Sequence, residues 1–151
     1  MKKIIVPVDG SPASEKAAEK AIEIAKIYGS EITFITIVDA RYIYTYDVGG
    51  IVSLPFDYPQ ITTGLIELQT KILDAFTDKL NLNGINIEKL VLHGVAYEEI
   101  LKYAKKINCD LIVMGRRGFS KVKRFFVGSV TQRVISDAPC PVLIINEKEE
   151  K

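Results

Sequence analysis

Five short apolar runs divide the chain, and segments with helical spacing of apolar residues lie between them. The runs are rich in isoleucine and valine and are bounded by glycine, proline, aspartate or asparagine, which is typical of strands buried on both faces. They span residues 2–8, 31–38, 85–94, 110–115 and 140–146. Strand and helix alternate four times, and parallel neighbours in a sheet need such crossovers. The pattern therefore predicts an α/β domain with a parallel sheet covered by helices.

The first intervening segment has clear helix boundaries. Ser11 is placed as the N-cap, Pro12 occupies the first helical position and Gly29 ends the helix. Its expected apolar face comprises Ala17, Ala18, Ala21, Ile22, Ala25 and Tyr28. Further helices are expected in 62–82, in 96–107 and in a short segment that carries Val130, Val134, Ile135 and Ala138.

One connection is unusually long. Residues 39–61 contain five of the chain's aromatic side chains and a central Gly49-Gly50 pair. A connection of this length in a compact domain is usually a functional lid or a disordered excursion, and its aromatics argue against plain disorder. We expect a single domain over residues 1–146, followed by a charged, solvated tail at 147–151.

Composition indicates a soluble globular protein with no global electrostatic specialisation. The chain has 151 residues, 26% of them charged and 48% hydrophobic, with a net charge of +1. Such a charge gives no general attraction to nucleic acid or to a membrane surface. Asp9 and Pro12 interrupt the first apolar run before a signal sequence could form. Cys109 and Cys140 lack CxxC spacing, which argues against a disulfide framework or a zinc site and favours two core thiols in a reduced, cytoplasmic location.

Common catalytic motifs are absent from the sequence. GxxxxGK[ST], GxGxxG, GxSxG and HExxH do not occur. His93 is the only histidine, which excludes a site built from several histidines, and we expect it to lie at a strand end.

A series of small residues gives the strongest chemical signal. Gly115 and Gly118 follow the strand at 110–115, and Gly128-Ser129 opens the last helix. Small residues let backbone N–H groups approach an anion, and a helix N-terminus adds a favourable dipole. Ligands of open α/β sheets bind at the carboxyl ends of strands, where the strand order reverses. Asp9 either faces the same crevice or serves as a turn residue, and Ser129 either binds a phosphate or caps its helix.

The nine residues 116–124, which lie between these glycines, contain five cations: Arg116, Arg117, Lys121, Lys123 and Arg124. This basic segment (116–124) is either solvated or holds an anion. For the last three a solvated role is favoured, whereas Arg116 either contacts a phosphate or points to solvent.

The spacing of Gly115, Gly118 and Gly128-Ser129 resembles the G-2x-G-9x-G-[ST] signature of ATP-binding universal stress proteins. The stretches "KKIIVPVDGSPASEKA", "CDLIVMGRRG" and "GSVTQRVISDAPCPVLII" resemble other conserved stretches of that family. The resemblance covers nearly the whole chain apart from the aromatic segment. It implies a Rossmann-like α/β/α sandwich, with an open five-stranded parallel sheet of order 3-2-1-4-5 and helices on both faces.

The resemblance also implies a binding site for ATP, ADP or AMP with Mg²⁺ or Mn²⁺. The implied binding residues are Pro7, Val8, Asp9, Ile37, Met114, Gly115, Arg116, Arg117, Gly118, Lys121, Gly128, Ser129, Val130 and Thr131. The first three would contact the nucleoside, and Asp9 would bond the ribose or help hold the metal ion. The backbone of Ile37 would read the adenine edge, and Met114 would pack near the base. The glycine loop and the start of the last helix would hold the phosphates.

The function implied is that of a nucleotide-dependent regulatory dimer in the stress response, acting with an unknown protein partner. Family members commonly pair the last strand across a two-fold axis, and an exposed apolar edge at Val142, Leu143, Ile144 and Ile145 would need such cover. The alternative is a slow ATP hydrolase, although no catalytic residue stands out. Nucleic-acid binding through the basic segment is less favoured, and no membrane partner is expected. The aromatic segment departs from the family pattern and could fold over the adenine or form a partner surface.

Overall fold

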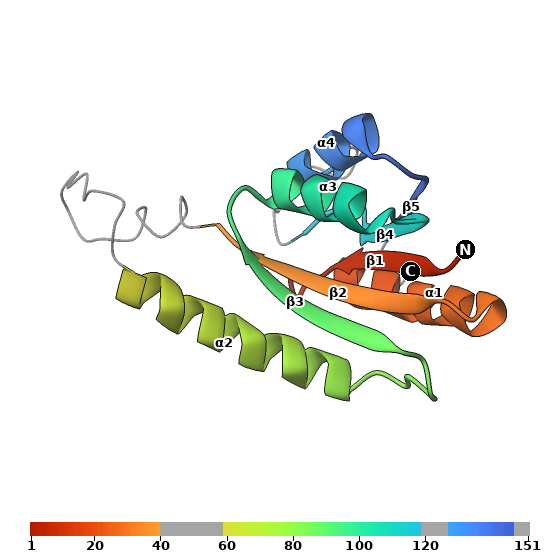
Figure 1. The fold of residues 1–151 in the computed structure, drawn as a ribbon, viewed down its shortest axis with the longest axis horizontal. Coiled ribbons are helices and arrows are strands. Elements are labelled where there is room, and N and C mark those ends of the chain that lie inside the picture. The colour runs from red at the N-terminus through yellow and green to blue at the C-terminus, as the bar shows by residue number, and fades with distance from the viewer. Residues whose placement is uncertain (40–58, 119–126, 147–151) are drawn as a thin grey trace, which may run out of the picture.

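The computed structural model describes residues 1–39, 59–118 and 127–146, and they form an open, five-stranded parallel sheet with helices on both faces (Figure 1). The strands are β1 (Lys3–Pro7), β2 (Glu31–Val38), β3 (Ile87–His93), β4 (Leu111–Gly115) and β5 (Val142–Ile145). The helices are α1 (Pro12–Tyr28), α2 (Pro59–Asp78), α3 (Ala96–Ile107) and α4 (Ser129–Asp137). The strand order is β3-β2-β1-β4-β5, as the resemblance implied.

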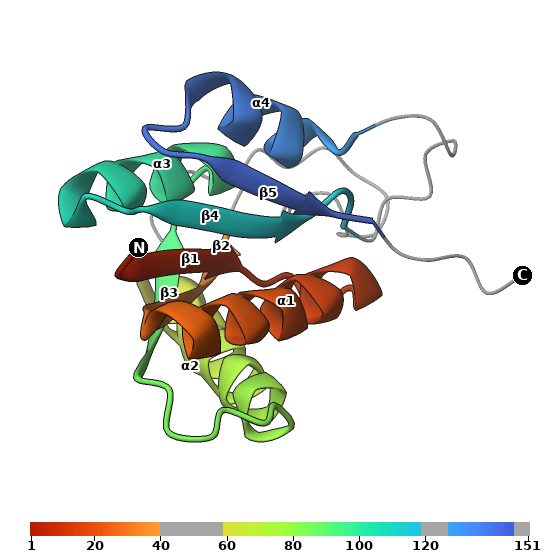
Figure 2. The same cartoon turned by 90° about the vertical axis from the view of Figure 1, so that its right-hand side faces the viewer.

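Two apolar cores lie on opposite faces of the sheet, because successive side chains of a strand point to opposite sides. Helices α1 and α2 cover one face, and α3 and α4 cover the other (Figures 1 and 2). Ile4 and Val6 of β1 belong to the core under α1 and α2, whereas Ile5 belongs to the core under α3 and α4. In the first core, the rings of Phe34 and Phe76 meet edge to face with centroids 6.2 Å apart. The two helix pairs therefore bury both faces of the central strands.

The expectation that all five strands are buried on both faces is correct only for the centre of the sheet. Strands β1, β2 and β4 are largely buried, whereas β5 is half-buried throughout and β3 exposes Glu88 and Lys89. Both β3 and β5 are edge strands, so each lacks one flanking neighbour among the described residues. Three residues whose helical spacing predicts an apolar face are also exposed: Tyr28, which ends α1, by 60%, Ile72 of α2 by 47% and Ile135 by 49%.

The boundaries of α1 agree with the sequence prediction. Ser11 is the N-cap, and its hydroxyl oxygen accepts a hydrogen bond from the Ser14 N–H at 3.2 Å. Pro12 is the first helical residue. Gly29 adopts a left-handed conformation with φ of 63°, and its N–H donates to the Ala25 carbonyl. Helix α1 therefore begins and ends where its capping residues require.

At the amino edge of the sheet, Asp110 joins the start of β1 to the entry of β4. Its carboxylate accepts hydrogen bonds from the backbone N–H groups of Lys2, at 2.7 Å, and Lys3, at 3.0 Å. These two bonds lower the pKa of Asp110, because they stabilise the ionised form.

At the carboxyl edge, β4 approaches α1 so closely that Gly115 leaves no space for a side chain. A Cβ atom there would lie 2.8 Å from the Ala13 Cβ and 3.0 Å from the Ala13 carbonyl carbon. Glycine at this position therefore allows α1 to pack against the end of β4.

We expect Asp110→Asn to destabilise the protein near neutral pH. A group whose pKa is lowered on folding contributes stability above its unfolded pKa of about 4, and that contribution is lost as pH falls through the folded value. The urea midpoint of the variant should therefore lie below that of the wild type at neutral pH and approach it in acid. An equal deficit at both pH values would contradict the role of the charge.

We expect Gly115→Ala to destabilise the fold by about 1–3 kcal/mol, because Ala13 backbone atoms must shift to admit the methyl group. Gly64→Ala in α2 is the matched control, since a Cβ there meets nothing within 4 Å. That change should stabilise the helix by about 0.5–1 kcal/mol. Urea denaturation measures both. Similar effects of the two substitutions would show that the close approach to Ala13 has no energetic weight.

Candidate functional site

The strand order reverses between β1 and β4, so the segments that follow these two strands lie beside one another. β1 pairs with β2 on one side and with β4 on the other. The chain leaves β1 towards Asp9 and leaves β4 towards Arg116 and Gly118. This reversal is where open α/β sheets bind ligands.

Hydrogen bonds of the Arg116 peptide group connect β4 to two other segments. Its N–H donates to the Ile145 carbonyl of β5 at 2.9 Å, and its carbonyl accepts from the Gly128 N–H at 3.0 Å. The Thr131 hydroxyl, in a residue only 3% exposed, donates to the Gly115 carbonyl at 3.1 Å. The predicted glycine series is thus brought together: Gly115–Gly118 and Gly128–Thr131 form one structural unit, here called the glycine cradle.

Asp9 lies against the glycine cradle and also serves as a turn residue. Its Oδ1 accepts hydrogen bonds from the Ser11 N–H at 3.0 Å and from the Ser11 hydroxyl at 2.6 Å. Its Oδ2 faces Gly118, where a Cβ atom would lie 2.1 Å from this oxygen. Both readings of Asp9 from the sequence therefore describe part of its environment: one oxygen closes the turn and the other faces the cradle.

The start of α4 presents backbone N–H groups beside the cradle. Gly128 is the N-cap, and the first hydrogen bond of the helix runs from the Gln132 N–H to the Gly128 carbonyl at 2.9 Å. The amides of Ser129, Val130 and Thr131 therefore precede the helical ladder, where N–H groups attract anions. Because Ser129 is the first helical residue, the interpretation of Ser129 as the cap is wrong.

The peptide of Ile37 faces the same crevice. Alternate residues of β2 direct their backbone hydrogen bonds towards β1. The Glu31 N–H donates to the Lys2 carbonyl, and the Ile35 carbonyl accepts from the Val8 N–H at 2.8 Å. β1 ends at Pro7, opposite Ile35. By this alternation the peptide groups of Ile37 point past the end of β1.

A cavity of about 500 Å³ adjoins the cradle between α2, α3, α4 and the end of β2. It is lined by Ile37, Val38, Asp39, Leu65, Gln69, Val95, Ala96, Tyr97, Ser129, Val130 and Arg133. Three of these were predicted site residues. Its volume falls within the range of small-molecule sites, about 300–1,000 Å³. The cavity and the adjoining N–H groups thus fit a ligand with a ring system and an anionic end.

Tyr97 and Arg133 form a wall of this cavity that sequence reasoning missed. The Arg133 guanidinium carbon lies 5.7 Å from the centre of the Tyr97 ring, a cation–π distance. The Tyr97 hydroxyl donates to the Glu98 carboxylate at 2.9 Å. A signal existed for Arg133, because it stands four residues after Ser129 and so shares its helix face. No comparable signal marked Tyr97, which lies in the helix predicted over 96–107.

Two predicted nucleoside contacts are mainly parts of the core. Val8 and Met114 are only 6% and 5% exposed, and the Val8 carbonyl accepts a hydrogen bond from the Thr36 hydroxyl at 2.9 Å. Pro7 is half-buried at the end of β1. Lys121, the aromatic positions 42–58 and the tail 147–151 lie outside the described residues.

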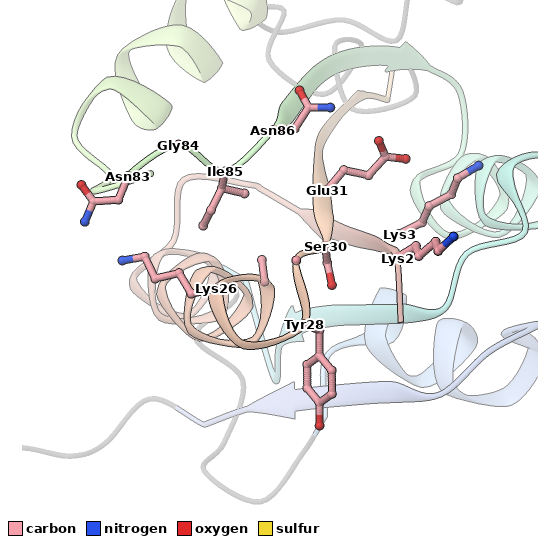
Figure 3. Close-up of a pocket in the computed structure, with 12 residues that line it drawn as sticks. Lys2, Lys3, Lys26, Tyr28, Ser30, Glu31, Asn83, Gly84, Ile85 and Asn86 are labelled. Carbon is pink, nitrogen blue, oxygen red and sulfur yellow. The ribbon is translucent and has the colours of Figure 1, made fainter.

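A second cavity lies at the opposite edge of the sheet (Figure 3). It measures about 660 Å³ and is bordered by the amino ends of β1 and β2, the end of α1 and the turn before β3. Lys2, Lys3, Lys26 and Glu31 are among its polar side chains. No predicted site residue lines it.

Within residues 1–39, 59–118 and 127–146, no group of three or more histidine, cysteine, aspartate or glutamate side chains is arranged to hold a metal ion. His93 ends β3 and is exposed, as expected. None of the helices in this part of the chain is long and apolar enough to cross a membrane.

Comparison with known proteins agrees with the resemblance. Universal stress protein MJ0531 of Methanocaldococcus jannaschii is 36% identical over 99% of this chain and 85% of its own length. YxiE of Bacillus subtilis, also a universal stress protein, is 33% identical over 95% of this chain and 97% of its own. The structure of the protein MJ0577 has a TM-score of 0.83 at 26% identity and covers 99% of this chain and 98% of its own.

Two further structures share the fold and contain nucleotides. A universal stress protein in complex with cAMP has a TM-score of 0.68 at 21% identity, covering 96% of both chains. An Arabidopsis thaliana family protein with AMP bound has a TM-score of 0.63 at 17% identity, covering 100% of this chain and 95% of its own. The sequence itself matches the universal stress protein family over residues 1–146. This chain therefore belongs to the universal stress protein family.

Proposed function

We propose that this protein binds an adenine nucleotide at the carboxyl edge of its sheet and acts as a nucleotide-dependent regulatory protein in the cytoplasm. The observation that carries the proposal is the convergence of Asp9, the glycine cradle and the amides at the start of α4 beside the cavity of about 500 Å³. The nucleotide complexes of the two related structures support the choice of ligand.

The base would occupy the cavity. Ile37 and Val130 provide apolar surface there, and the Ile37 peptide supplies a donor and an acceptor for the edge of a purine. Tyr97 and Arg133 offer a flat, positively charged wall against which a ring or a phosphate could pack.

The phosphates would lie on the cradle. The amides of Ser129, Val130 and Thr131 favour an anion at the start of α4. The Thr131 hydroxyl is already a donor to Gly115, so we assign it to holding the cradle together rather than to the phosphates. A divalent ion would arrive with the phosphates, which supply the hard oxygen ligands it prefers, and Asp9 Oδ2 is the carboxylate oxygen facing the cradle.

We expect ATP, ADP or AMP with magnesium to raise the melting temperature of nucleotide-free protein. A ligand at a hundred times its dissociation constant stabilises by about 2.7 kcal/mol, which is a shift of several degrees for a domain of this size. Gly128→Glu should abolish the shift, since it places a carboxylate among the phosphate-binding amides. Gly128→Ala is its matched control and should retain binding, because a Cβ there lies 3.5 Å from its nearest neighbours, an ordinary contact.

Two further measurements separate the alternatives. Lys26→Glu changes the cavity of Figure 3 and should leave the nucleotide-induced melting shift intact. If Lys26→Glu abolished the shift and Gly128→Glu did not, the nucleotide site would lie at the amino edge of the sheet. Rapid phosphate release from ATP would favour the hydrolase instead. No shift with any adenine nucleotide would refute the proposal.

The protein is further proposed to form a homodimer through β5. The Pro141 and Ile145 carbonyls accept hydrogen bonds from β4, so the alternate residues Val142 and Ile144 direct their peptide groups away from β4. All four side chains of β5 are apolar and half-buried. A second copy of this strand would cover both the peptide groups and the apolar surface.

Ile144→Pro should convert the dimer to a monomer, because proline removes the N–H that points away from β4. The residues of β5 whose backbone groups form hydrogen bonds with β4 stay unchanged. Ile144→Val keeps the N–H and is the control. Light scattering after gel filtration gives the mass of each. A wild-type monomer, or a proline variant that remains dimeric, would contradict pairing through β5.

A further inference from the structure

The two cysteines lie far apart in the sequence but enter neighbouring strands at the same edge of the sheet. Cys109 stands two residues before β4, and Cys140 stands two residues before β5. The strands pair in parallel with Ile112 opposite Val142, and the Ile112 N–H donates to the Pro141 carbonyl at 3.0 Å. Both side chains belong to the core between the sheet and helices α3 and α4.

The backbone at these entries has dimensions that suit a disulfide. Neighbouring strands lie about 4.8 Å apart, and the register of β4 and β5 places Cys109 and Cys140 one residue out of step just before these two strands begin. Disulfides commonly join Cα atoms about 4.4–6.8 Å apart. The two side chains pack in the same core, and each influences the pKa of the other.

The two thiols differ in access and in acidity. Cys109 is buried, and its Sγ donates to the Leu111 carbonyl at 3.1 Å, whereas Cys140 is half-exposed. Burial, and secondly the neighbouring Cys140, raise the pKa of Cys109 to about 12. Burial also raises the pKa of Cys140. Cys140 is therefore the thiol that a reagent reaches first.

We propose that Cys109 and Cys140 are a modification site, at which a low-molecular-weight disulfide converts the two thiols to a reversible intramolecular disulfide. The bond would close a loop that contains β4, the glycine cradle and α4. It would thus fasten together the entries of the two strands whose far ends hold the cradle.

The reaction proceeds by two thiol–disulfide exchanges. The Cys140 thiolate attacks one sulfur of the reagent, forming a mixed disulfide and releasing one reagent thiolate. Cys109 then loses its proton and attacks Cys140 Sγ, which forms the protein disulfide and releases the second reagent thiolate. In total, two protein thiols are oxidised and one reagent disulfide is reduced to two thiols.

The test uses the folded, full-length protein in glutathione buffers that range from reducing to oxidising. After quenching with an alkylating reagent, intact mass counts the free cysteines, and peptide mapping identifies the linkage. Oxidising buffer should give a monomolecular product that lacks two hydrogens and takes up no alkyl group. Added dithiothreitol should restore both thiols. Wild-type protein that stays reduced, or that accumulates glutathione on Cys140 with Cys109 still free, would overturn the proposal.

Single variants test the order of the two steps. Cys109→Ser should trap glutathione on Cys140, because no resolving thiol remains. Cys140→Ser should leave Cys109 largely unmodified, because the buried thiol is inaccessible. The same glutathione uptake in both variants would contradict an attack that begins at Cys140.

Melting of the oxidised wild type shows whether the bond fits the native fold. A disulfide closing a loop of this length should raise the melting temperature by about 5–10 °C over the reduced protein. Neither single variant should show this rise in the same buffer. A lower melting temperature on oxidation would mean that the bond forms only in a distorted molecule, and would overturn the proposal.

Discussion

The arrangement of the carboxyl edge of the sheet depends on the backbone N–H and carbonyl of Arg116. Its N–H is bound to β5 and its carbonyl to Gly128, so one residue fixes the end of β4 relative to the last strand and the last helix. The Thr131 hydroxyl adds a second connection through the Gly115 carbonyl. Gly115 in turn meets Ala13 of α1 without room for a side chain. Backbone groups rather than long side chains therefore set the shape of the cradle, which is how such a unit can be held rigid before any ligand binds.

Much of the fold could be predicted because its causes are local. Buried parallel strands produce continuous apolar runs, and Ser11, Pro12 and Gly29 mark the ends of α1 by their own chemistry. The strand order came from the family resemblance. The exposure of β3 and β5 was missed because it depends on which strands lie at the edges, a property of the whole sheet.

The candidate site could be predicted from the sequence where its residues lie close together along the chain. The glycine cradle was visible because its members stand at fixed spacing, whereas Ile37 was proposed only through the family resemblance. The walls supplied by Gln69, Tyr97 and Arg133 come from three different helices, and no spacing rule links them. The contact of Cys109 with Cys140 was missed for the same reason: rules on cysteine spacing count along the chain, whereas this pair is brought together by the register of β4 and β5.

The hydrogen bond between Gly128 and Arg116 has a consequence for how the protein can change. Arg116 and Gly128 are held to each other by this bond, so the two ends of the intervening segment are fixed by the domain rather than by the segment's own sequence. Once the ends are held, each doubling of a loop's length costs only about 0.6 kcal/mol of closure entropy. A foreign peptide could therefore be grafted between these two residues without rebuilding the sheet.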